Sequence, residues 1–93
     1  MTQLLNDDEI TQRLQGTEWR REGEEIVRER EFKDFAEAIA FVNRVAEAAE
    51  EANHHPDILV HGWNKVRLSL TNHSAGGLTE PDFEMAGRFD ALG

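Results

Sequence analysis

The sequence contains no cysteine and no tyrosine, and only two prolines interrupt its 93 residues. Without cysteine, the chain can form neither disulfide bonds nor Cys-ligated zinc sites, and it has no thiolate nucleophile. Basic residues are also scarce: 10 Lys and Arg stand against 19 Asp and Glu, for a formal net charge of −9. Nucleic acids and anionic membranes are therefore not expected as direct partners, because phosphate binding depends on clustered cationic charge.

Long apolar runs are absent as well. No segment approaches the ~20 apolar residues that cross a bilayer. The start, MTQLLNDDEI, has no basic region followed by an apolar run, so we expect no signal peptide and a cytoplasmic protein. Hydrophobic residues make up 39% and charged residues 31%, which is typical of a globular protein. Residues 1–93 are too few for two independent cores, so we predict a single domain.

The first half of the chain predicts a helix, a β-hairpin and a second helix. Residues 6–15 begin with an Asn and a Glu at capping-box spacing, which predicts a short helix. Residues 19–32 alternate with a period of two around Gly23, which indicates two hairpin strands. Asp34 can cap a long helix that ends near residue 53. The apolar face predicted for this helix consists of Phe35, Ile39, Val42, Val45, Ala46 and Ala49.

The second half predicts another pair of strands and a last helix. Residues 58–60 and 66–70 are the expected strands, with His61 and Gly62 at a turn or bulge between them. Thr79 can cap the last helix. Its predicted apolar face consists of Phe83, Ala86, Phe89 and Leu92. The order α-β-β-α-β-β-α predicts an α+β fold, in which a four-stranded antiparallel sheet is covered by three helices on one face.

Histidine is rare, yet three of the four histidines fall within eight positions. His54 and His55 follow the long helix and precede a proline, and His73 stands just past the last strand. Each has a structural interpretation: an imidazole at a helix C-terminus is favoured by the macrodipole, and His61 and His73 fit exposed turns. Both His-rich segments nevertheless lie at element ends, where functional groups concentrate.

Three kinds of chemistry could involve these segments: metal binding, nucleophilic catalysis and proton transfer. Three imidazoles can bind zinc, but adjacent residues such as His54 and His55 diverge, and no His-x-x-x-His spacing is present. Ser69 and Ser74 lack the Gly-x-Ser-x-Gly elbow of a nucleophile. Proton transfer remains, because histidine is the side chain whose charge changes near neutral pH, so one ring can donate while another accepts. We therefore expect an acid–base site without a metal.

The stretch EEANHHPDILVHGWNKVRLSLTNHSAGGLTEPDF, residues 50–83, resembles the signature of the pterin-4a-carbinolamine dehydratases. The matching features are an acidic residue four before His-His-Pro, an aromatic followed by Asn-Lys-Val, Thr-x-His, Gly-Gly-Leu-Thr and an Asp. The resemblance implies the same four-stranded antiparallel sheet with three helices on one side. It also implies dehydration of a 4a-hydroxytetrahydropterin to the quinonoid dihydropterin, with the pterin as substrate and with no cofactor.

The resemblance also implies roles for single residues. His54 and His73 correspond to the acid–base pair, and His55 to the residue that binds and orients the pterin while helping proton transfer. Glu50 and Asp82 would orient imidazoles or meet the amino edge of the pterin. The remaining pocket residues implied by the resemblance are Pro56, Asn72, Ser74 and Ala75.

Two departures from vertebrate members are visible. One more residue lies between His-His-Pro and the aromatic, which suggests a bulge at His61 and Gly62, and Ile58 replaces an aromatic. Members of the family also act as a dimerisation cofactor of a transcription factor or resemble assembly factors, so a protein-interaction role is the alternative function. An aromatic amino-acid hydroxylase or a transcription factor is then a possible partner. The small core and the strand 66–70, which has a sequence partner on one side only, predict a homodimer or homotetramer.

Overall fold

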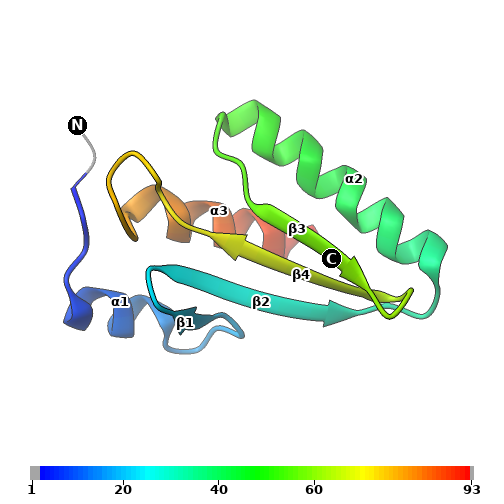
Figure 1. Ribbon diagram of the computed structural model, residues 1–93, viewed down its shortest axis with the longest axis horizontal. Coiled ribbons are helices and arrows are strands. Elements are labelled where there is room, and N and C mark those ends of the chain that lie inside the picture. Colours follow the sequence, from blue (N-terminus) through cyan, green and yellow to red (C-terminus); the bar gives the residue numbers. More distant parts are fainter. Residues whose placement is uncertain (1–2, 93) are drawn as a thin grey trace.

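The computed structural model describes residues 3–92 and contains three helices and four strands (Figure 1). In chain order the elements are α1 (Asp7–Leu14), β1 (Arg20–Glu22), β2 (Glu25–Glu31), α2 (Phe35–Ala52), β3 (Asp57–His61), β4 (Lys65–Leu70) and α3 (Glu80–Ala91). This order confirms the predicted α-β-β-α-β-β-α arrangement. None of the helices in the described part of the chain is both long and apolar enough to span a membrane.

The four strands form one antiparallel sheet in the order β1-β2-β4-β3, so β3 is an edge strand. The pairing of β3 with β4 runs unbroken from Asp57 opposite Ser69 to His61 opposite Lys65. Of the turn or bulge predicted at His61 and Gly62, the bulge is therefore wrong, whereas the turn is confirmed at Gly62 and His61 belongs to the strand. The chain reverses instead at Gly62 and Trp63, which both have positive φ (55° and 58°), because left-handed residues match the twist of a hairpin.

One face of the sheet forms the core with all three helices. Val66, Leu68 and Leu70 of β4 are at most 1% exposed and belong to one hydrophobic cluster. The helices add residues to the same cluster, among them Ile10 of α1, Phe41 of α2 and Phe89 of α3. The sheet and its helices thus bury a single core, as the α+β prediction requires.

The buried face of α2 differs from the predicted face. Its buried residues are Ala38, Phe41, Val45, Ala48 and Ala49. Phe35 is 54% exposed and Ala46 is also exposed, so the prediction was wrong for these two residues. The helix is oriented by Phe41, whose ring lies 5.1 Å from the Phe32 ring and 4.8 Å from the guanidinium of Arg30. Burial, reinforced by the neighbouring Arg28, lowers the pKa of that guanidinium.

A second strip of α2, which adjoins the buried face, carries apolar residues that the core does not fully cover. We call them the outer strip; they are Phe35, Ile39, Val42 and Ala46. On α3 the buried residues include Met85, which the predicted face omitted, whereas Phe83 and Leu92 are only partly buried.

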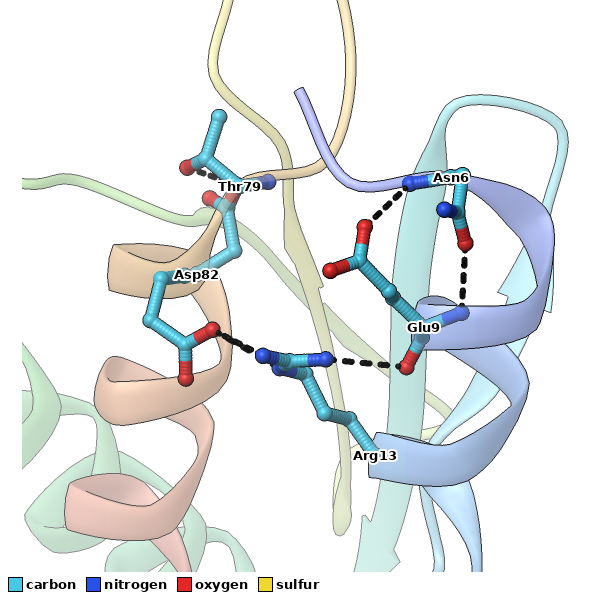
Figure 2. A network of polar contacts seen from close by, with 6 residues as sticks. Asn6, Glu9, Arg13, Thr79 and Asp82 are labelled. Carbon is cyan, nitrogen blue, oxygen red and sulfur yellow. Dashed lines mark hydrogen bonds and ion pairs between the residues drawn. The ribbon is translucent and has the colours of Figure 1, made fainter. Parts of the chain in front are cut away.

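The N-terminal segment and α1 hold the start of α3 (Figure 2). Asn6 and Glu9 form the predicted capping box, with hydrogen bonds of 2.8 and 2.9 Å. Arg13 of α1 reaches across to Glu80, the first residue of α3, at 2.8 Å, and this hydrogen bond raises the pKa of Arg13. The backbone N–H of Leu5 donates to the carbonyl of Leu78 at 2.9 Å. These contacts fix the turn of α3 that contributes to the site described next.

Candidate active site

The C-terminus of α2 positions two histidines. Asn53 adopts the left-handed conformation (φ 51°), and the N–H groups of Asn53 and His54 bond back to the carbonyls of Glu50 and Ala49 at 3.3 and 3.1 Å. This Schellman pattern satisfies the last carbonyls of the helix and turns the chain sharply. His54 and His55 therefore emerge at the bend between α2 and β3, as the sequence predicts.

A loop after β4 positions the third histidine. The loop closes on Asn72, whose carbonyl accepts hydrogen bonds from the N–H groups of Gly76 and Gly77 at 2.9 and 3.2 Å. The side-chain oxygen of Asn72 accepts the N–H of Ala75 at 3.0 Å. Gly76 has a φ of 83°, a backbone conformation that residues other than glycine rarely adopt. His73 lies on the exposed part of this closed loop and is held there by the backbone.

The two segments meet at one pocket with a volume of about 250 Å³. Its lining residues are Asn53, His54, His55, Thr71, Asn72, His73 and Ser74. The structure thus brings together three histidines that are up to nineteen positions apart in the chain. Pro56 and Ala75 are not lining residues but are each next to one along the chain.

His54 is the most buried of the three and has a buried partner. Its Nε2 atom lies 2.6 Å from Oδ1 of Asp82, and its side chain is 18% exposed whereas that of Asp82 is 0% exposed. Asp82 stands at the third position of α3, and its Oδ2 accepts both the N–H and the hydroxyl of Thr79, at 2.8 and 2.9 Å. Asp82 therefore lies behind the imidazole and not on the pocket wall. Of the two roles that the resemblance implies for Asp82, this position supports orienting an imidazole.

The other two histidines are more accessible. Nε2 of His55 lies 2.6 Å from Oε2 of Glu50, and both side chains are more than half exposed, so this pair is oriented but well solvated. The His73 ring has no hydrogen-bond partner within residues 3–92 and is exposed. The pocket thus combines one anchored imidazole with two imidazoles that remain open to a ligand.

The family model described as "Pterin 4 alpha carbinolamine dehydratase" matches residues 3–92. The chain belongs to this family. A relative named a pterin-4-alpha-carbinolamine dehydratase, from Trichormus variabilis, is 53% identical over 87 residues, which is 92% of each chain. Another of the same name, from Picosynechococcus sp., is 50% identical over 93 residues and covers 99% of this chain and 100% of its own.

Solved structures of the dehydratase family agree with this fold. The crystal structure of a transcriptional coactivator/pterin dehydratase from Brucella melitensis superposes with a TM-score of 0.88 at 34% identity, covering 95% of this chain and 96% of that one. A pterin dehydratase-like protein identified as a RuBisCO assembly factor in the alpha-carboxysome has a TM-score of 0.69 at 29% identity, covering 83% and 90%.

Some features of this dehydratase-family site were not anticipated. Asn53 and Thr71 line the pocket, and the left-handed Asn53 is the kind of helix-ending residue that could have been recognised. His61 does not line it: it ends β3 and lies 3.3 Å from Glu29. In the described residues no three His, Asp or Glu side chains form a group that could hold a metal ion.

A larger hollow of about 590 Å³ lies along α2 but contains no histidine. Its lining residues are Ala46, Glu47, Glu50 and Glu51. It touches the histidine site through Glu50, which pairs with His55. Its volume alone does not make it the active site, because proton transfer requires groups that both donate and accept, and these gather in the smaller pocket.

Proposed function

We propose that this protein dehydrates a 4a-hydroxytetrahydropterin to the quinonoid dihydropterin by acid–base catalysis. The observation that carries the proposal is the convergence of His54, His55 and His73 on one pocket of about 250 Å³. Family membership supports the substrate class, because relatives about 50% identical over most of the chain carry the dehydratase name. The pterin is the substrate, and the proposal requires no further cofactor.

The proposed reaction balances with two proton transfers. The C4a–O bond breaks, and the leaving hydroxyl takes a proton from a protonated imidazole and departs as water. A ring N–H of the pterin gives its proton to a neutral imidazole, and its electron pair forms the new double bond to C4a. No electrons leave the substrate, so histidines alone can serve as the proton donor and acceptor.

The three histidines take different roles in this proposal. His54, anchored by Asp82, and His73, which is free of protein partners among the described residues, exchange protons with the substrate. His55 orients the pterin and assists proton transfer, with Glu50 holding its ring. Asn72 and Ser74 line the pocket beside them and contact the substrate, and Pro56 and Ala75 support the two pocket segments.

Stopped-flow measurement of 4a-hydroxytetrahydropterin dehydration by the purified protein tests the proposal. The uncatalysed rate is measured in parallel and subtracted, and a chelator is added in a second series. We expect a rate proportional to protein concentration and unaffected by chelator. A rate equal to the uncatalysed one at micromolar protein would refute the catalytic function.

The alternative function is protein interaction. Two solved relatives support it, because one is named a transcriptional coactivator/pterin dehydratase and the other a RuBisCO assembly factor. The structure offers two surfaces for contacts: the outer strip of α2, and the edge strand β3, where Ile58 and Leu59 are 37% and 52% exposed. The same surfaces support the proposed homodimer or homotetramer, since an unpaired edge and a partly covered apolar strip are both open to association. We favour catalysis because an interaction-only role gives no reason for three histidines to share a pocket.

A further inference from the structure

A buried polar pair stands behind His54, outside the pocket. Thr79 and Asp82 are both 0% exposed, which is unusual for an aspartate unless its oxygens have partners. Oδ2 of Asp82 accepts two hydrogen bonds from Thr79, one from its N–H and one from its hydroxyl. Oδ1 is left for a single partner, Nε2 of His54, at 2.6 Å. The pair thus presents one particular oxygen to the imidazole.

We propose that Thr79 and Asp82 are positioning residues that fix the tautomer of His54, with the proton on Nε2 and the lone pair of Nδ1 directed to the pocket. The backbone N–H of Thr79 can only donate, so Oδ2 is an acceptor. Asp82 also lies in the first turn of α3, where the helix dipole favours an ionised carboxylate. An ionised carboxylate can only accept, so Oδ1 requires the N–H of the imidazole.

The alternative tautomer is disfavoured by the same geometry. With the proton on Nδ1, the lone pair of Nε2 would face the lone pairs of Oδ1 across 2.6 Å, beside a carboxylate that is 0% exposed. A buried acceptor without a donor is costly. Nδ1 itself has no partner in the described part of the chain and is not a buried atom, so it is the nitrogen available to a ligand.

The catalytic consequence of this His54 tautomer rests on the proposed function. His54 would exchange protons with the substrate through Nδ1, and Thr79 would act only through Asp82. The role resembles that of the aspartate in a Ser-His-Asp triad, which holds the histidine in the working tautomer without touching the substrate.

The test is the ¹⁵N NMR spectrum of protein labelled in its histidine rings, with the His54 signals assigned by their loss in His54→Gln. We expect neutral His54 to be protonated on Nε2 in the wild type and in Thr79→Ser. In Asp82→Asn the amide oxygen keeps the two Thr79 donors, so the NH₂ group faces His54 and the tautomer should reverse to Nδ1–H. The matched control is Asp34→Asn. The Asp34 carboxylate caps α2 by accepting a hydrogen bond from the backbone N–H of Glu37 at 2.8 Å, so this variant should leave the tautomer of His54 unchanged.

Activity supplies the second readout. We expect Asp82→Asn to lower kcat by roughly 10² to 10⁴ with KM within a few-fold, and Thr79→Val, which keeps the backbone donor, to lower it by about ten-fold. A wild-type His54 protonated on Nδ1, or an Asp82→Asn protein with an unchanged tautomer, would overturn the proposal. If Asp82→Asn does not fold, the wild-type spectrum still decides. A wild-type Nε2–H tautomer without dehydratase activity would refute the proposed function and leave the positioning role standing.

Discussion

His54→Ala and His73→Ala should lower kcat to a similar extent, but only His54→Ala should clearly lower the stability of the fold. In the proposed mechanism each ring exchanges a proton with the substrate, so His54→Ala and His73→Ala should each lower kcat by roughly 10² to 10⁴. This range corresponds to about 2.7 to 5.4 kcal/mol of transition-state stabilisation. The surroundings of the two rings are unlike, however, because only His54 is bonded to a fully buried carboxylate.

The stability difference follows from what each substitution leaves behind. His54→Ala removes the partner of Oδ1 of Asp82, while the two Thr79 donors keep Oδ2 satisfied. Losing a partner of a buried charged group costs about 3 to 5 kcal/mol when the space stays dry. The His54 side chain is 18% exposed, so water can enter from the pocket, and we expect a smaller loss of about 1 to 3 kcal/mol. His73 is exposed and has no polar partner in residues 3–92, so His73→Ala should stay within about 0.5 kcal/mol.

Stopped-flow kinetics and thermal unfolding on the same preparations measure both effects. In a domain of this size, 1 to 3 kcal/mol lowers the melting temperature by roughly 5 to 20 °C. His61→Ala is the control for a histidine outside the pocket and should leave kcat unchanged. The reasoning would be refuted if His73→Ala were as destabilising as His54→Ala, or if His61→Ala were as damaging to catalysis as His73→Ala.

Three further outcomes are expected. His55→Ala should raise KM at least as much as it lowers kcat, because it removes binding shared by the ground and transition states; a pure kcat effect would contradict the orienting role. Gly76→Ala should cost about 1 kcal/mol in unfolding free energy and lower kcat/KM several-fold, because φ 83° strains any side chain in the loop that carries His73; unchanged kinetics would show that the loop need not be rigid. Light scattering should find a dimer or tetramer at micromolar concentration, and the charged variants Leu59→Lys and Ala46→Glu should show which surface associates; a monomeric wild type would contradict the assembly.

The helix boundaries were readable from the sequence because capping is local. Asn6, Asp34 and Thr79 each precede the first residue of a helix in the structure, as their spacing predicted. The face that α2 buries was readable only in part: Val45 and Ala49 are buried as predicted, but Phe35 and Ala46 are exposed. Two apolar strips run along this helix, and periodicity cannot tell which one meets the sheet. The choice depends on contacts of Phe41 with Phe32 and Arg30, which come from another element.

The candidate site was predictable only in part, for the same reason. Both histidine segments lie at element ends, and an antiparallel sheet with its helices brings such ends together. The contact between His54 and Asp82 joins residues 28 positions apart on different elements, so no local pattern indicates its geometry. The resemblance supplied Asp82 as a site residue, but its depth behind the imidazole became evident only with the fold.

The start of α3 shows why stability and chemistry are coupled in so small a domain. Asp82 both caps α3, through the backbone N–H of Thr79, and holds His54. A substitution of Asp82 therefore changes the helix cap and the imidazole together, and activity loss alone would not separate them. Thr79→Ser keeps both hydrogen bonds and removes only a methyl group, whereas Thr79→Val keeps the shape and removes the hydroxyl. Comparing these two variants isolates the hydroxyl, because a defect of packing should appear in the serine variant and a defect of positioning in the valine variant.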